Sequence, residues 1–114
     1  MLRRSRNGPT ATLPPYDDGF LRVDFERRQV RLEAKTVNLS PKEWRLLECL
    51  MREPGRVVTR DVLLRHVWGD GFEDEVNYLK VFVSHLRRKL GEPSAHPHYI
   101  HTERELGYRF ERRV

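Results

Sequence analysis

Three helix signatures follow one another in the middle of the chain, and this succession constrains the fold more than any other feature of the sequence. The first is the clearest, because Ser40 is placed as N-cap, Pro41 takes the first helical position, and Glu43 completes a capping box. Apolar residues recur at helical spacing in each segment. Three helices in this order predict a helix–turn–helix unit. The first ends at Pro54-Gly55, the second lies between Thr59 and Gly69, and the third runs from about Glu75 to Leu90.

Strand patterns flank the helices on both sides. Between Phe20 and Leu39, apolar and polar residues alternate in three short runs, which predicts a small antiparallel meander. After the helices, Tyr99–Thr102 and Tyr108–Phe110 predict a C-terminal hairpin. The first 15 residues show neither period, so we predict a linker over 1–15 and one domain over 16–114. The expected fold class is α+β, with an N-terminal antiparallel sheet, three helices and a C-terminal hairpin.

The composition excludes several classes of protein. A chain of 114 residues has room for one compact domain, and its 22 Lys and Arg against 17 Asp and Glu give a net charge of +5. Such a domain attracts polyanions, nucleic acid first and an anionic membrane surface second. No apolar run approaches the roughly 20 residues of a membrane span. A single cysteine, Cys49, excludes an internal disulfide framework and a multi-cysteine zinc site, so we expect a soluble cytoplasmic protein.

The third helix carries the most functional information. Its apolar stripe predicts a buried face, and the opposite arc is polar and basic, with no acid after Glu75 and one apolar residue, Val81. Lys and Arg neutralise phosphates, Asn and Ser bond to base edges, and valine methyls suit a thymine methyl. The alternative is an ordinary solvated helix face. The stripe consists of Val76, Leu79, Val83, Leu86 and Leu90, and the candidate DNA-binding face consists of Asn77, Lys80, Val81, Ser84, His85, Arg87 and Arg88.

The predicted hairpin supplies a second candidate contact. Arg104 lies near its tip, where a long cation reaches into a minor groove, and Thr102 is placed to donate to a phosphate. An ordinary solvated turn is the alternative for Arg104, because Glu103 and Glu105 stand on either side of it.

Metal and catalytic sites have little support. His96, His98 and His101 form H-x-H-x-x-H, which fits no standard zinc spacing, so we expect neither a metal nor a cofactor there. Cys49 stands in a helical apolar pattern, so we expect it to be a packing residue or semi-exposed, and not a nucleophile. The sequence contains no phosphate-binding loop, dinucleotide fingerprint, serine nucleophile elbow or zinc-protease motif. It therefore predicts a binding protein and not an enzyme.

Taken in order, these segments resemble the C-terminal effector domain of OmpR/PhoB-type response regulators, a winged helix–turn–helix. The resemblance covers about Phe20 to Arg112, and five motifs in the right order are far more specific than any one of them. The third helix is similar to that of Kdp-type potassium-transport regulators. The matching stretches are LSPKEWRLL at 39–47, PGRVVTR at 54–60, Leu63-Leu64 with Val67-Trp68, HLRRKL at 85–90 and GYRF at 107–110.

The resemblance implies a function and a set of partners. In such domains the third helix enters the major groove of double-stranded DNA, and the hairpin, or wing, approaches the minor groove. Residues 69–76 correspond to a loop that touches RNA polymerase in relatives, and a receiver domain with its sensor kinase supplies the signal. We expect the isolated domain to be a monomer that binds direct repeats head to tail. The family contacts fall on Asn77, Lys80, Val81, Ser84, His85, Arg87, Thr102 and Arg104.

The sequence departs from the family pattern at three places. The wing has Glu105 where relatives usually have Gly, and its carboxylate opposes phosphates. Many relatives carry Arg at the positions of Asn77 and His85, so this helix offers less positive charge. Residues 2–5 resemble the last turn of a receiver's final helix, so we expect the chain to be a C-terminal fragment.

Two other functions stay open at this stage. A winged-helix protein-interaction module would use the acidic segment 69–76 and bind no DNA. An RNA-binding winged helix would prefer structured RNA to duplex DNA. A steep salt dependence of binding to random duplex DNA favours the DNA-binding function over both.

Overall fold

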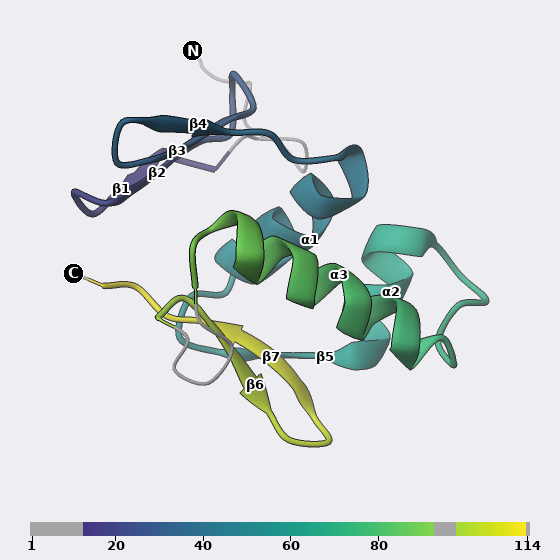
Figure 1. Cartoon of the computed structure of the whole chain (residues 1–114). Helices are drawn as coiled ribbons and strands as arrows, with labels where there is room; N and C mark the ends of the chain where they lie inside the picture. Colours follow the sequence, from purple (N-terminus) through teal and green to yellow (C-terminus); the bar gives the residue numbers. More distant parts are fainter. Residues whose placement is uncertain (1–12, 93–97, 114) are drawn as a thin grey trace, which may run out of the picture.

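The computed structural model describes residues 13–92 and 98–113, which form two sheets around three helices (Figure 1). The predicted N-terminal meander is confirmed, and a further strand, β1, pairs with its first strand to complete a four-stranded antiparallel sheet. Two residues are too few for a periodicity argument, so the sequence did not indicate β1. The strands are β1 (Tyr16–Asp17), β2 (Leu21–Asp24), β3 (Gln29–Leu32) and β4 (Lys35–Val37), in that order across the sheet.

The helices begin close to where their caps predict. In the capping box, Ser40 Oγ accepts from the Glu43 N–H at 3.2 Å, and a Glu43 carboxylate oxygen accepts from the Ser40 N–H at 2.8 Å. Thr59 Oγ1 accepts from the Val62 N–H at 3.4 Å and caps the second helix. The third helix has no side-chain N-cap, so the packing of its apolar face must hold its first turn. The helices are α1 (Pro41–Met51), α2 (Arg60–Trp68) and α3 (Val76–Lys89).

The C-terminal hairpin is confirmed and gains a third strand. It consists of β6 (Ile100–Glu103) and β7 (Gly107–Phe110), and β5 (Val57–Thr59) lies against β7 on the other side. The sequence did not indicate β5, because pairing between distant segments leaves no local pattern. A Cβ at Gly107 would lie 2.0 Å from the Val58 carbonyl oxygen, so only glycine permits this close approach.

The helices and both sheets share one core. Of the predicted stripe on the third helix, Leu79, Val83, Leu86 and Leu90 are buried, whereas Val76 is only partly buried because it occupies the first turn, at the end of the helix. Cys49 packs in the core as expected, and burial raises the pKa of its thiol to about 11.

Two buried carboxylates fix the third helix and the hairpin in place. Glu43 accepts from Lys89 Nζ at 2.7 Å, which joins the start of α1 to the end of α3. Glu92, just after α3, accepts from the backbone N–H groups of His98, Tyr99 and Ile100, the last at 3.1 Å. The end of α3 is thus held against both α1 and the beginning of β6.

The predicted histidine motif falls partly outside the described residues, because His96 is not among them. His98 is exposed, and His101 Nε2 lies 3.4 Å from the His98 carbonyl oxygen. Among residues 13–92 and 98–113, no group of three or more His, Cys, Asp or Glu side chains is arranged to hold a metal ion. Within the same ranges, none of the helices has the length and apolar character needed to cross a membrane.

Candidate nucleic-acid interface

The polar face of α3 is exposed along its whole length. All of its predicted residues except Arg87 are exposed, and the leucines and valine of the opposite face are buried. Val81 is 49% exposed at the centre of this face. Tyr78, which flanks it, is equally exposed. The prediction that Val81 is the one apolar residue of this face is therefore wrong. Exposed residues of the face are Asn77, Lys80, Val81, Ser84, His85 and Arg88.

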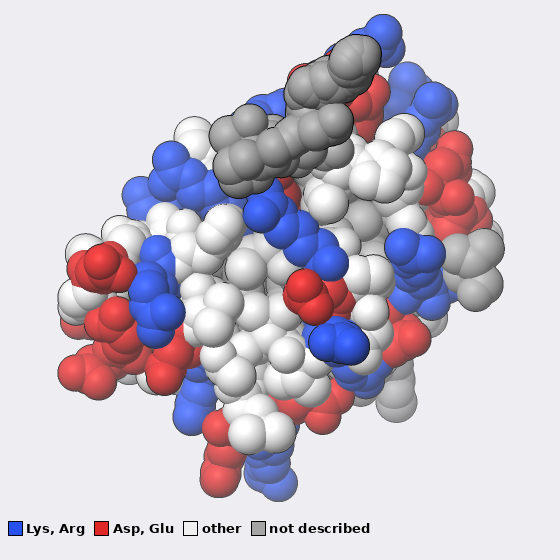
Figure 2. All heavy atoms as spheres, turned by 180° about the vertical axis from the view of Figure 1, so that it is seen from behind, with Lys and Arg blue, Asp and Glu red and all other residues white. Residues whose placement is uncertain are grey.

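Positive charge on this face is largely uncompensated. The 14 residues of α3 include no acid, and its last turn carries Arg87, Arg88 and Lys89. Lys89 is bound to Glu43, but within the described ranges no carboxylate lies within 4.0 Å of Lys80 or Arg88. The reverse of the molecule is different, because its Lys and Arg alternate with Asp and Glu around a broad uncharged area (Figure 2). The α3 face is therefore the better site for a polyanion.

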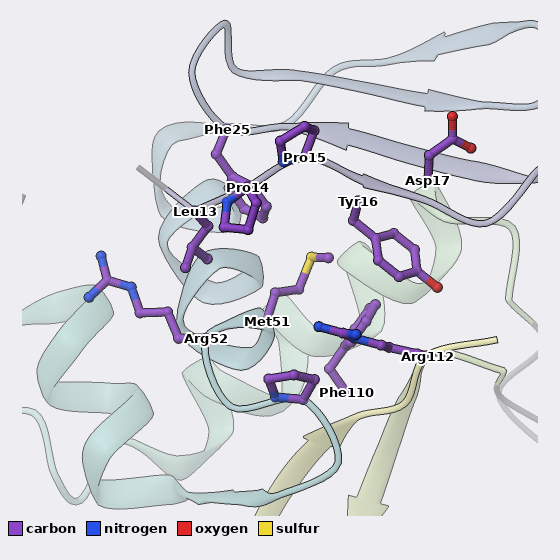
Figure 3. A pocket seen from close by; sticks show the side chains of 11 residues that line it. Leu13, Pro14, Pro15, Tyr16, Asp17, Phe25, Met51, Arg52, Phe110 and Arg112 are labelled. Carbon is purple, nitrogen blue, oxygen red and sulfur yellow. The ribbon is translucent and has the colours of Figure 1, made fainter. Parts of the chain in front are cut away.

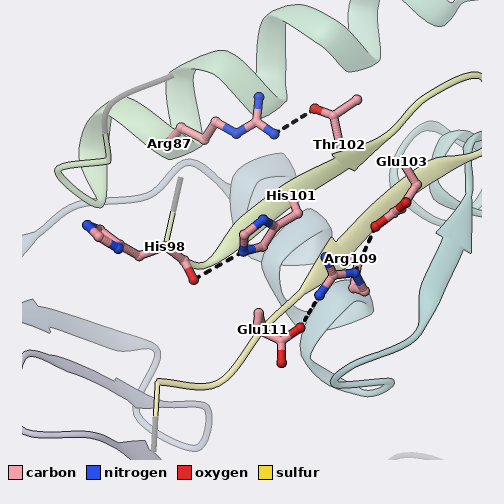
Figure 4. Close-up of polar contacts among 7 residues, drawn as sticks. All are labelled: Arg87, His98, His101, Thr102, Glu103, Arg109 and Glu111. Carbon is pink, nitrogen blue, oxygen red and sulfur yellow. Dashed lines mark hydrogen bonds and ion pairs between the residues drawn. The ribbon is translucent and has the colours of Figure 1, made fainter. Parts of the chain in front are cut away.

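Arg87 joins α3 to the wing (Figure 4). Its Nε donates to the Ile100 carbonyl at 3.0 Å and its Nη2 donates to Thr102 Oγ1 at 2.7 Å, while the guanidinium carbon lies 5.9 Å from the centre of the Tyr108 ring. Burial lowers the pKa of Arg87 from its usual value. Two residues that the sequence placed separately at the interface thus form one unit. Because the Thr102 oxygen accepts this bond, its hydroxyl hydrogen is available to donate elsewhere.

The wing tip differs from what its sequence implies about charge. The Glu103 carboxylate accepts a hydrogen bond from Arg109 Nε at 2.9 Å, so its negative charge is paired with Arg109 and not only adjacent to Arg104. Arg109 also pairs with Glu111 (Figure 4). Arg104 is exposed at the turn. Glu105 adopts φ of 63°, in the left-handed region that favours glycine, which gives a backbone reason for the glycine expected there.

The sequence did not indicate two further residues here, one in the turn itself and one on α2 that bonds to the turn. Leu106 is 60% exposed, and Arg60, the first residue of α2, donates through Nη2 to the Glu105 carbonyl at 3.1 Å. An apolar residue inside a charged turn was a usable signal for Leu106. No local pattern indicates the Arg60 contact, because it joins α2 to a turn 45 residues further along the chain.

The segment after α2 is acidic but partly neutralised. Arg65 Nε lies 3.9 Å from an Asp70 carboxylate oxygen and 3.5 Å from one of Glu73. The Gly71 N–H donates to Glu73 at 3.1 Å, and hydrogen bonding holds the pKa of Glu73 below its usual value. Phe72 is 37% exposed beside these charges. The loop therefore offers an ordered mixture of acidic and aromatic groups.

A hollow of about 360 Å³ lies away from this face, between the start of the described chain, the end of α1 and the end of β7 (Figure 3). Phe25, Met51 and Phe110 form apolar parts of its wall, and Arg112 also lines it. Its described lining contains no Ser, Thr, Cys or His. The polar groups among the residues that line it are the Tyr16 phenol, the Asp17 carboxylate and the guanidinium groups of Arg52 and Arg112.

Comparison with known proteins identifies the fold and the family. The sequence model of the family described as "Transcriptional regulatory protein, C terminal" matches residues 34–110. The chain belongs to this family. The transcriptional regulatory protein KdpE of Mycobacterium tuberculosis H37Rv is 37% identical over 110 residues, which cover 96% of this chain and 49% of that protein. The sensory transduction protein RegX3 of Mycolicibacterium smegmatis is 42% identical over 116 residues, covering 97% of this chain and 50% of that protein. The chain thus spans about half the length of these curated relatives.

Solved structures agree with this membership. The Klebsiella pneumoniae RstA DNA-binding domain, in a crystal structure with the RstA box, has a TM-score of 0.77 at 32% identity, covering 85% of this chain and 96% of that one. The Thermotoga maritima response regulator DrrB, an OmpR/PhoB homologue, also has a TM-score of 0.77 at 32% identity, covering 86% of this chain and 44% of that one. The predicted OmpR/PhoB-type winged helix–turn–helix is confirmed. The chain is a DNA-binding output domain of the response-regulator type.

Proposed function

We propose that this chain binds double-stranded DNA with sequence specificity, as the output domain of a two-component transcriptional response regulator. The observation that carries the proposal is the exposed, acid-free face of α3 beside a wing that Arg87 bonds to the same helix. An α-helix fits the major groove, and a hairpin tip reaches the adjacent minor groove. The RstA domain in complex with its box shows that a chain of similar structure was crystallised with its DNA, which supports the same mode here.

The exposed side chains divide into three roles. Asn77, Ser84 and His85 are polar groups that bond to base edges in the major groove, with Lys80 bonding to guanine or a phosphate. Val81 contacts a thymine methyl. Arg87, Arg88 and Thr102 contact phosphates near the end of α3, and Arg104 enters the minor groove.

Arg87 contributes both to the DNA-binding face of α3 and to the attachment of the wing. Two of its donors are used within the protein, on Ile100 and Thr102, so it presents fewer donors to a phosphate than the exposed Arg88. The Thr102 hydroxyl compensates in part, because it donates while accepting from Arg87. Removing Arg87 is therefore expected to weaken phosphate contacts and to loosen the wing together.

Family membership supports the partners and the assembly that we propose. A receiver domain and its sensor kinase control the domain, two copies bind direct repeats head to tail, and the isolated domain is a monomer in the cytoplasm. Residues 1–15 act as the linker and 16–114 as the effector domain. The domain acts by binding and carries no catalysis of its own. A strong dimer at micromolar concentration without DNA, or a footprint with inverted symmetry, contradicts this arrangement.

A second contact is favoured by the loop between α2 and α3. The acidic groups that Arg65 organises and the exposed ring of Phe72 suit a protein surface, and residues 69–76 are proposed to touch RNA polymerase. This contact is compatible with DNA binding, because it uses a different surface.

The proposal is tested by titrating the protein with random duplex DNA at two salt concentrations, followed by selection of bound sites from genomic DNA. Each neutralised phosphate contributes about 0.9 to the slope of log affinity against log salt. We expect a steep slope and an enriched direct repeat. Absence of duplex binding at low salt favours a protein-interaction module instead, and tighter binding to structured RNA favours an RNA-binding winged helix.

A further inference from the structure

The turn of the wing is bonded to the first residue of α2. The Arg60 N–H donates to the Leu106 carbonyl at 3.1 Å, and Arg60 Nη2 donates to the Glu105 carbonyl, also at 3.1 Å. Both carbonyls belong to the turn that carries Arg104. In Figure 1 the start of α2 and the wing tip lie at the same end of the molecule. One residue of α2 therefore holds two successive peptide groups of the tip.

The conformation of this turn needs a restraint. Glu105 has φ of 63°, and a residue with a side chain keeps this backbone conformation only where its surroundings hold it. Within the turn, the Leu106 N–H donates to the Glu103 carbonyl at 2.9 Å. The guanidinium of Arg60 supplies the second restraint, on the carbonyl of Glu105 itself.

The stability of α2 does not explain an arginine at this position. Arg60 is the first residue of the helix, where a cation meets the positive end of the helix dipole. No carboxylate among the described residues lies within 4.0 Å of its guanidinium. Within the described residues, the side-chain hydrogen bond of Arg60 goes to the wing, at the Glu105 carbonyl.

We propose that Arg60 is a positioning residue of the wing. It holds the turn in the conformation that presents Arg104 to the minor groove, and so sets the preference for base pairs beside the half-site without contacting a base. The inference rests on the proposed function and deepens it. It separates two kinds of specificity, because α3 discriminates the core of the site and Arg60, through Arg104, discriminates its flank.

The first test needs no DNA. Arg60→Met removes the side-chain bond and keeps the backbone bond, and Arg60→Lys keeps the charge but replaces the planar guanidinium with one ammonium nitrogen. We expect the Leu106 amide hydrogen to exchange about fivefold faster in Arg60→Met, the effect of one ordinary hydrogen bond, and at an intermediate rate in Arg60→Lys. Arg56→Met is the matched control, because it removes the same charge from a side chain that is 80% exposed. Equal exchange in Arg60→Met and the wild type overturns the proposal.

The second test compares duplexes that share one core and differ in the flank. The wild type is expected to bind an A·T-rich flank severalfold more tightly than a G·C-rich flank. In Arg60→Met this ratio should fall towards one, while the preference for the core over a scrambled core is retained. A retained flank ratio, an equal loss of both preferences, or a wild type without flank preference each overturns the proposal. If the wild type binds no duplex, the proposed function fails, and the exchange measurement alone decides the role of Arg60.

Discussion

Val81→Ala is the sharpest test of the base-contacting face of α3. The side chain is 49% exposed in the free domain, so about half of its surface is left for a partner to bury. The substitution removes two methyl-sized groups, worth about 1.6 kcal/mol if fully buried at about 0.8 kcal/mol each, and half of that burial already exists without DNA. The expected loss is therefore about 0.8 kcal/mol, or about fourfold in affinity for the cognate site. Folding and random-DNA binding should be almost unchanged.

The assay is a titration of cognate and random duplexes at one salt concentration, repeated with the contacted thymine replaced by uracil. Uracil should reproduce the loss in the wild type and add little in the variant, because both changes remove the same methyl contact. Val62→Ala is the matched control, since Val62 is 43% exposed on α2. If the two losses simply add, Val81 does not contact the methyl, and base recognition belongs to Asn77, Lys80 and His85.

Three further predictions concern charge. Arg88→Ala should flatten the log–log salt slope by about 0.9 and weaken cognate and random duplexes alike, and a changed sequence preference with an unchanged slope contradicts this. Glu105→Gly should tighten DNA binding by removing a carboxylate and relieving the positive φ, while Glu105→Gln isolates the charge; unchanged or weaker binding in both would mean that the wing stays off the DNA. Burial opposes ionisation of Glu43, but hydrogen bonds from Lys89 and Ser40 outweigh it and hold the pKa of Glu43 below its usual 4.5. The stabilisation by this pair is therefore complete above that pH and disappears as the pH falls through the lowered pKa, so the urea midpoints of the wild type and Lys89→Met should converge in acid; a gap that persists there argues against the pair.

Most of the secondary structure was predictable because its signals are local. The capping box at Ser40 and Glu43 is formed, the two faces of α3 are divided as periodicity requires, and the hairpin strands lie where alternation predicts. The candidate site was predictable to the same extent, since exposure of Asn77, Lys80 and Ser84 follows from their spacing on one helix. Their contacts with DNA stay predictions.

The predictions that were wrong or missing concern features that leave no clear local signal in the sequence. β1 was missed because two residues show no period, and Tyr78 was missed as an exposed ring because an aromatic residue at the edge of a stripe faces either way. The charge of Glu103 was misjudged because its partner, Arg109, is on the neighbouring strand.

The sequence by itself determined the helices, the hairpin, the polar face of α3 and the family, since each depends on residues within a few positions or on motifs in order. Only the tertiary structure decided which groups meet. It placed β5 against β7, Arg87 on Thr102, and Arg60 on the carbonyl of Glu105. Hydrogen bonds between distant segments impose no period on the chain, because any residue supplies a backbone carbonyl and packing alone determines which donor reaches it.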